Sequence, residues 1–330
     1  MKRLLFLLLL IPILSFGQEV IVSGQDVTTY NGKALTYTVP VYGTEYQAVY
    51  DAFTTPPSAA IASAQNTLVE TLVAAGVWTK LDVFYLFAQT TNAGGEALIN
   101  WVTPASFTAT LHNTASVDPT FTPLEGFSNT GNGYLKLNWI PSTDATKLSQ
   151  NDASVGAYFR VATAGTDIDL GVVTNSTRWI SLTARNSTDR TQCKVCDNQG
   201  SSLIQTSALG LHIGTRTAVN EVKSYRNKIN ISNGAGASTG VPTLTPFILS
   251  LNNVGSPLHY SAQQISLVFF GSKFLQADVD AMTDAVEVYM DSNSKGVIAY
   301  NPMEDLLLLQ YLALQQRINN YESTIINIVP

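Results

Sequence analysis

The spacing of two aspartates would bring their carboxylates together on one face of a predicted strand. Asp167 and Asp169 flank a single residue, and alternate residues of a strand share one face. Such a pair could serve as nucleophile and general acid in retaining glycoside hydrolysis, which needs carboxyl groups about 5–5.5 Å apart. In a second interpretation the two carboxylates bind calcium, because oxygen ligands suit that hard ion. In a third they are structural residues at a turn or a strand edge, where Asp is common. Position 171 is glycine, so no third acid follows on that face, and we predict no catalytic residue.

Thiols and imidazoles are too few for a metal centre. The only cysteines, Cys193 and Cys196, have CxxC spacing, while His112, His212 and His259 are scattered along the chain. A structural zinc site needs four ligands, which this set does not supply. We therefore interpret the cysteines as strand or turn thiols, either free or joined in a disulfide. Apart from calcium at Asp167 and Asp169, we expect no cofactor.

Aromatic side chains offer a different chemistry, glycan binding. Their faces can stack on the C–H surfaces of sugars, and each also has a core position as its alternative, because aromatic rings fill sandwich cores. Trp139 lies at the end of an expected strand and is our first candidate for an exposed contact. Trp179 is the second, and Tyr134 and Tyr158 lie in the same strand-rich region.

The composition excludes several classes of protein. Charged residues make up 13% of the 330-residue chain and hydrophobic residues 45%, with a net charge of −6. Typical domains have about 25% charged residues, whereas here Thr, Ser and Asn outnumber charged residues by about two to one. A nucleic-acid-binding protein would need a basic footprint, and a disordered chain would have fewer apolar residues. The surface is expected to consist of hydroxyls and amides.

The elements that position these residues are mostly short strands. Between residues 105 and 273 the pattern predicts an antiparallel sandwich or jelly roll, preceded by a helix from about 57 to 75, a strand at 81–88 and a second helix at about 92–101. A helix at 276–291 follows, and residues 19–47 read as one or two strands with a turn at 30–33. The predicted strands of the sandwich are 107–111, 134–137, 154–160, 168–173, 179–185, 192–196, 209–214, 219–226, 247–251 and 265–271.

The N-terminus has the layout of a secretory signal peptide. Lys2 and Arg3 precede an apolar run at 4–14, and Ser15 and Gly17 supply small residues before Gln18. This arrangement is typical of exported proteins, and the run is too short to span a bilayer comfortably. A buried hydrophobic N-terminus is the alternative. Export would place the protein outside the cell, at its surface or in the periplasm.

The C-terminal tail carries an apolar series with heptad spacing. Steps of four and three residues indicate either a coiled-coil seam that joins copies of the chain or a helix packed on its own domain. The series consists of Leu307, Tyr311, Leu314, Ile318, Tyr321, Ile325 and Ile328.

Three segments resemble the concanavalin A-like lectin/glucanase superfamily, in particular its laminin-G-type jelly rolls. They read FTPLEGFSNTGNGYL at 121–135, NDASVGAYFR at 151–160 and ISLVFFG at 265–271. The resemblance covers about 105–291, and the same arrangement also resembles structural proteins of bacteriophages. It implies a jelly roll, in a superfamily that includes glycan-binding and adhesion modules, glucanases and polysaccharide lyases. Fold alone does not assign a function.

Together these patterns predict a mainly β protein, a sandwich jelly roll with a helical preface and a C-terminal helix. The expected function is non-catalytic glycan binding or adhesion by an exported homo-oligomer. A virion structural or receptor-binding protein of a bacteriophage is one alternative, and a polysaccharide hydrolase or lyase is another. The expected segments are a signal peptide at 1–17, a strand extension at 18–56, a helix-strand-helix preface at 57–104, the jelly roll at 105–295 and the tail at 296–330.

Cleavage of the signal peptide gives the first testable prediction. Removal of residues 1–17 should leave Gln18 as the N-terminus and change the net charge from −6 to −8, because Lys2 and Arg3 are lost. Intact-mass measurement of the protein from its natural source checks this. A chain that retains Met1 would contradict export by this route.

Overall fold

The structure is a computed structural model that describes residues 29–30, 33–34, 41–115, 117–161, 164–165 and 168–298. The chain divides into two units, Met1–Val41 and Tyr42–Pro330. In the first unit, strands β1 (Thr29–Tyr30) and β2 (Lys33–Ala34) pair antiparallel, which confirms the expected hairpin. The predicted signal peptide and the apolar series from Leu307 to Ile328 lie outside the described residues.

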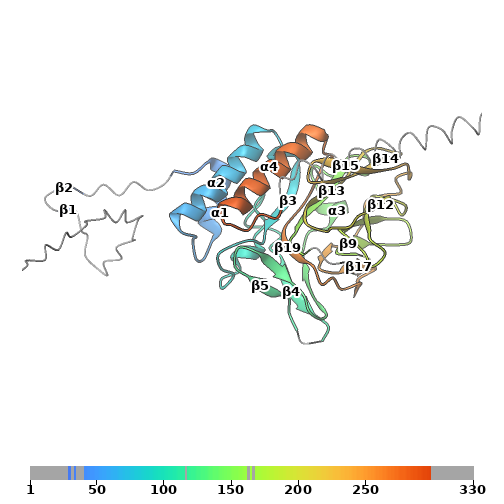
Figure 1. Cartoon of the computed structure of the whole chain (residues 1–330), viewed down its shortest axis with the longest axis horizontal. Coiled ribbons are helices and arrows are strands. Elements are labelled where there is room, and N and C mark those ends of the chain that lie inside the picture. The colour runs from blue at the N-terminus through green and yellow to red at the C-terminus, as the bar shows by residue number, and fades with distance from the viewer. Residues whose placement is uncertain are drawn as a thin grey trace, which may run out of the picture. The chain divides into compact units, whose positions relative to one another are not determined.

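Helices α1 (Thr44–Ala52), α2 (Ala59–Ala74) and α4 (Gln276–Ser292) form a layer on one side of the second unit, where α2 and α4 lie side by side (Figure 1). Both α2 and α4 confirm the sequence prediction. Helix α2 stops before Gly76, whose φ of 71° suits glycine. Within the described ranges, no helix is long and apolar enough to span a membrane.

Two expected elements are wrong. Helix α1 occupies part of the region assigned to a strand extension, because Tyr46, Val49 and Phe53 are spaced to bury one helical face. The helix expected at 92–101 is only a single 3₁₀ turn, η2 (Glu96–Leu98). There the Glu96 carboxylate accepts hydrogen bonds from the backbone N–H groups of Thr55 and Gly94, which fixes a loop instead of a longer helix.

The described strands form two antiparallel-rich sheets that pack as a sandwich, as the sequence predicts. The outer sheet has the order β12-β11-β10-β9-β16-β7-β4, with the β17–β18 hairpin beside β9. The central sheet has the order β15-β14-β13-β8-β19-β6-β5, with β3 also paired to β19.

Every predicted strand overlaps an observed one, whereas the sequence does not predict β5, β6, β12, β15 or β18. The outer strands are β4 (Thr110–Asn113), β7 (Gly133–Lys136), β9 (Leu170–Val173), β10 (Trp179–Thr183), β11 (Arg190–Val195), β12 (Ser201–Ile204), β16 (Phe247–Ile248), β17 (Leu251–Asn253) and β18 (Ser256–Leu258). The central strands are β3 (Leu81–Leu86), β5 (Thr120–Thr122), β6 (Gly126–Ser128), β8 (Ala153–Phe159), β13 (Gly210–Ala218), β14 (Glu221–Arg226), β15 (Ile229–Gly234) and β19 (Gln264–Gly271). Two short helical turns, η1 (Trp78–Lys80) and α3 (Pro141–Asp144), complete the elements.

The central sheet is buried on both faces. All of β3 and β8 and nearly all of β19 are buried. Val155 and Phe159 face the outer sheet, whereas Tyr158 and Phe269 face the helices. The outer sheet packs on β8 and β19 with one face and turns its other face outward, which explains the alternating burial of β11 and β7.

Close contact between β8 and β19 requires a glycine. Gly156 lies opposite Phe269 in the register, and a Cβ at position 156 would come within 2.3 Å of that ring. The ring therefore lies over bare backbone, and a larger residue at 156 would displace it.

A buried ion pair joins the two sheets. Arg216 on β13 and Asp197, which follows β11, are both fully buried and form a salt bridge. Arg216 also donates Nε to the carbonyl of Val195 at 2.5 Å and Nη1 to that of Val219 at 2.7 Å. Asp197 in turn accepts from the backbone N–H of Gly200 at 2.5 Å. The pair is thus hydrogen-bonded on all sides, as a buried charge must be.

Breaking this pair from one side should strongly destabilise the fold. Arg216→Met leaves a buried carboxylate uncompensated, so we expect a loss of about 3–5 kcal/mol in the free energy of unfolding. Lys223→Met is the control, because it removes an ion pair with Glu221 that is partly exposed and should cost about 1 kcal/mol or less. Urea unfolding followed by fluorescence measures both. Equal effects would contradict the structural role of the buried pair.

Candidate functional site

The outward face of the outer sheet contains a groove. Alternation along β7 and the residues that follow it turns Leu135, Leu137 and Trp139 into the core. The side chains between them then point outward. We call the resulting depression, of about 320 Å³, the outer groove. Its lining residues are Lys136, Asn138, Ile140, Leu244, Thr245, Phe247, Asn252 and Gly255.

A row of aromatic rings borders the outer groove. The Tyr134 ring centroid lies 4.5 Å from that of Phe247, and on its other side His112 stacks at 5.4 Å with an interplanar angle of 19°. His112 is directly opposite Tyr134 on β4. Tyr134 is half-buried, and burial raises the pKa of its phenol, so the hydroxyl stays a neutral hydrogen-bonding group. The row holds one aromatic ring in place while leaving part of it accessible.

Polar groups in the groove are held by the backbone around them. Asn138 donates Nδ2 to the carbonyl of Thr108 at 2.8 Å, and Asn252 donates Nδ2 to the carbonyl of Thr245 at 2.8 Å. Thr245 is only 8% exposed, and within the described residues its buried hydroxyl has no hydrogen-bond partner. The groups of the groove that a ligand can reach are therefore the more exposed ones, above all Asn138.

Two of the expected glycan contacts are wrong. Trp139 is fully buried, with its ring 5.4 Å from that of Phe270, because it shares the inward parity of Leu137. Tyr158 is fully buried beneath α4, where its hydroxyl donates to the Glu287 carboxylate at 2.5 Å and accepts from the Val297 N–H at 2.9 Å. Tyr158 therefore fastens the chain that follows α4, and neither ring can stack on a sugar.

Trp179 lies outside the outer groove. It begins β10 and is separated from β7 by β9 and β16 in the sheet order. Its ring is half-buried, but the ammonium of Lys194 lies 3.9 Å from the ring centroid, and its indole N–H donates to the carbonyl of Ser176 at 3.3 Å. A sugar could stack on that face only by displacing Lys194.

The proposed carboxylate pair is not available as expected. Asp169 is fully buried, and its oxygens accept from the Ser261 hydroxyl at 2.6 Å and the Ala184 N–H at 2.7 Å. Burial raises the pKa of Asp169 to about 7. Asp167 lies outside the described residues, and the described part of the chain holds no cluster of three or more acidic, histidine or cysteine side chains. Calcium binding therefore gains no support from Asp169.

Asp278, near the start of α4, is also buried. Its carboxylate accepts a hydrogen bond from the backbone N–H of Leu275 at 2.8 Å at the start of α4 and pairs with Lys80 at 2.6 Å. Its role is to cap α4 and to tie that helix to η1.

The two cysteines are free thiols and form no disulfide. Cys193 lies on β11 and its Sγ lies 2.8 Å from the Ser224 hydroxyl. Cys196 has left-handed backbone at φ 58° and is fully buried, which raises the pKa of its thiol to about 12. Both thiols are packing residues on the inner side of the outer sheet.

Sequence reasoning found Tyr134 but missed its partners in the groove. The parity of β7 was the available signal, because Tyr134, Lys136 and Asn138 alternate with apolar residues that the core requires. No sequence signal could bring Thr245, Phe247 and Asn252 to the same place, since they reach it only through the pairing of β16 with β7. His112 likewise depends on the pairing of β4 with β7.

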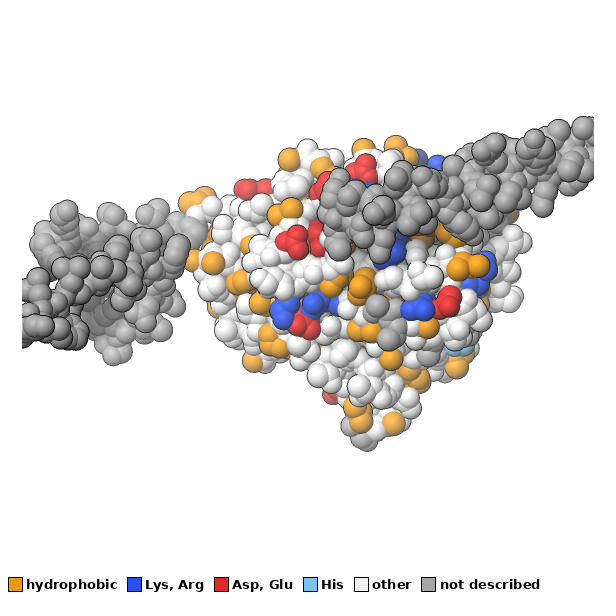
Figure 2. All heavy atoms as spheres, viewed as in Figure 1, with side chains coloured by type: hydrophobic (Ala, Val, Ile, Leu, Met, Phe, Trp, Pro, Cys, Tyr) orange, Lys and Arg blue, Asp and Glu red, His pale blue; other side chains and the backbone are white. Residues whose placement is uncertain are grey.

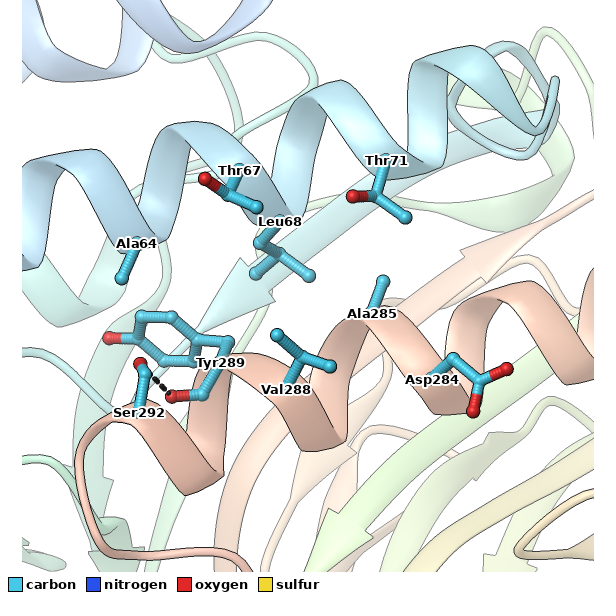
Figure 3. A pocket seen from close by; sticks show the side chains of 9 residues that line it. All are labelled: Ala64, Thr67, Leu68, Thr71, Asp284, Ala285, Val288, Tyr289 and Ser292. Carbon is cyan, nitrogen blue, oxygen red and sulfur yellow. Dashed lines mark hydrogen bonds between the residues drawn. The ribbon is translucent and has the colours of Figure 1, made fainter.

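A second groove lies between α2 and α4 and has a different chemistry (Figure 3). It measures about 250 Å³, and Leu68, Ala285 and Val288 contribute apolar side chains to it. Two of its hydroxyls are already used, since Thr67 donates to the carbonyl of Ser63 and Ser292 to that of Tyr289. This groove suits an apolar side chain better than a sugar, which needs several hydrogen-bonding groups.

The surface agrees with the composition. In Figure 2 most of the visible face is white, and Lys, Arg, Asp and Glu side chains occur in small mixed groups. Exposed large hydrophobic residues, such as Val254 and Val288, are scattered among them. A surface of this kind offers many neutral hydrogen-bonding groups and no broad basic face in this view.

Comparison with known proteins gives only distant likenesses. The sequence matches no protein-family model and no curated protein. Domain 4 of an extracellular arabinanase from Geobacillus stearothermophilus, solved with arabinotriose, aligns at 15% identity and a TM-score of 0.39, over 62% of this chain and 98% of that one. The receptor-binding domain of botulinum neurotoxin D aligns at 11% identity and 0.44, over 63% and 53%. A Trypanosoma rangeli sialidase mutant with trans-sialidase activity aligns at 9% identity and 0.44, over 71% and 39%. At these TM-scores the likenesses add nothing to the assignment of a function.

The buried thiols give a prediction about reactivity. Because Cys193 and Cys196 are free and buried, the native protein should react slowly with a thiol reagent such as Ellman's reagent, and denaturation should release both thiols. Intact mass should be the same with and without reductant. A mass lower by two hydrogens in the unreduced protein would show the disulfide that the structure lacks.

Proposed function

We propose that this protein is a non-catalytic glycan-binding or adhesion protein and that the outer groove is its sugar site. The observation that carries the proposal is the half-exposed ring of Tyr134, held between His112 and Phe247 at the edge of a polar groove. The part of this ring that its two neighbours leave accessible, beside fixed amides, gives an apolar surface for the C–H groups of a sugar and polar groups for its hydroxyls.

The size and the polar groups of the groove fit a small part of a glycan. Its volume of about 320 Å³ lies at the lower end of the range typical of ligand pockets, about 300–1,000 Å³. Asn138 is exposed, and because its Nδ2 is engaged by the carbonyl of Thr108, its Oδ1 can accept from a sugar hydroxyl.

The proposal is non-catalytic because the described lining residues of the outer groove include no Asp or Glu. Retaining and inverting glycosidases generally use a pair of carboxyl groups that flank the scissile bond. Asp169, the described member of the expected pair, is buried and occupied by protein donors. Binding without turnover is therefore the function that these residues support.

Three finer statements belong to the same proposal. We place the sandwich among concanavalin A-like jelly rolls, on the sequence segments quoted above. Export and assembly through the tail from Leu307 to Ile328 are proposed from the sequence alone. A virion role would use the same tail, which lies outside the described residues, so the outer groove favours glycan binding as the function to test first.

Substitution of Tyr134 tests the site. Aromatic stacking contributes about 0.5–1.5 kcal/mol beyond burial, so Tyr134→Ala should weaken glycan binding by roughly tenfold, whereas Tyr134→Phe keeps the ring and should retain most of it. A glycan array identifies the ligands and titration calorimetry measures the Kd of each variant. Thermal unfolding confirms that both variants are folded.

Two control variants locate the effect. Trp179→Ala changes the other half-exposed ring on the outer sheet, and Val288→Ser changes the groove between α2 and α4, where Val288 is 60% exposed. Neither should alter glycan affinity. If Trp179→Ala abolishes binding while Tyr134→Ala leaves it intact, the outer groove is not the site. The absence of any bound glycan would reject the proposed function itself.

A further inference from the structure

We propose that the outer groove selects anionic sugars, those that carry a carboxylate or sulfate group, through Lys136. This inference rests on the proposed glycan-binding function. Lys136 is half-buried in the groove, and no carboxylate lies within ion-pair distance of its ammonium in the described part of the chain. Most other described lysines are neutralised by a carboxylate, and these are Lys80, Lys223, Lys228, Lys273 and Lys295.

The register places Lys136 at the centre of the site. It lies opposite Thr110 on β4 and opposite Phe247 on β16, so both neighbours across the sheet are uncharged. Tyr134 is two residues away on the same face, which corresponds to about 7 Å along a strand. A sugar ring bound against the accessible part of Tyr134 could therefore direct a charged substituent to the Lys136 ammonium.

The local charge favours an anion even though the whole chain is acidic. The described lining residues include one cation, Lys136, and no acid. The net charge of −6 belongs to groups elsewhere, whose fields are screened over about 8 Å at physiological ionic strength. At the groove itself, the half-buried lysine is less screened than a fully exposed one and gains more from a charged partner.

The other groups of the groove suit an acidic sugar as well. Asn138 is exposed, and its Oδ1 can accept from a hydroxyl of the same sugar because its Nδ2 is held by the carbonyl of Thr108. Lysine acts as a compact point charge and lacks the fork geometry that arginine offers to carboxylates. The shared chemistry is thus a negative charge, and carboxylated and sulfated ligands must be separated by experiment.

The test uses an array of neutral, uronate-containing, sialylated and sulfated glycans, followed by calorimetry with the full-length protein. Each acidic ligand is paired with the same glycan carrying the methyl ester or lacking the sulfate. Wild-type protein should prefer the acidic member of a pair by about tenfold, as expected for a charge-assisted hydrogen bond. Lys136→Gln should abolish that preference, so that the acidic and the neutral member of each pair bind this variant with the same Kd. The carboxylate and sulfate pairs show which anion is used.

Net charge and ionic strength provide the controls. Lys228→Gln removes the same charge at the turn before β15, where Lys228 pairs with Asp284 of α4, and should leave the preference unchanged. Raising the salt concentration from about 0.05 to 0.5 M should weaken acidic ligands in the wild type more than in Lys136→Gln, because salt screens the charge pair.

Each outcome decides between the two proposals. Neutral glycans that bind through Tyr134 without any acidic preference would overturn the role of Lys136 and leave the proposed function standing. Acidic ligands that bind Lys136→Gln as tightly as wild type would do the same. If no glycan of any class binds in a Tyr134-dependent way, both the glycan site and its anionic selectivity are rejected.

Discussion

Burial of the central sheet on both faces is the constraint on which the rest of the structure depends. Helices α2 and α4 cover one face of β8 and β19, and the outer sheet covers the other. Strands in this position must be apolar at almost every residue, because neither face meets water. The residues that bury these strands come from segments that lie far apart in the sequence, from α2 through β8 to α4. Within the described chain it leaves the outward face of the outer sheet as the broad surface on which polar side chains can alternate.

The same constraint explains how a chain with so few charges uses them. Buried and half-buried charges hold the fold together, since Arg216 and Asp197 tie the two sheets together and Glu287 holds Tyr158 and the chain after α4. Most of the described, partly exposed lysines are paired with acids. Lys136 has no acidic partner among the described residues and lies on the outward face, among hydroxyls, amides and aromatic rings. A surface largely free of competing charge makes one lysine a local determinant of what can bind.

Much of the fold could be predicted from residue periodicity. The strands of the sandwich, α2 and α4 were all indicated by spacing, because a strand or helix that packs on one side carries its apolar residues at a fixed period. Predictions failed where the local sequence was compatible with more than one secondary structure. The segment containing Tyr46 and Val49 alternates loosely enough to suggest a strand but packs as helix α1. The segment around Glu96 has helix-forming residues, yet its carboxylate satisfies loop N–H groups instead.

By itself, then, the sequence determined most of the element types and the polar character of the surface. The parity of β7, which puts Tyr134 and Lys136 on the face opposite Trp139, was also present in it, but we expected Trp139 to be exposed. Tertiary structure alone decided that Tyr158 and Asp169 are buried and that Phe247, Thr245 and Asn252 meet Lys136 in one groove beside Tyr134. The reason is physical: alternation says which side of its own strand a residue occupies, whereas burial and neighbours depend on what packs against that side. For β8 a layer of helices does so, and for β7 the described structure leaves the groove open.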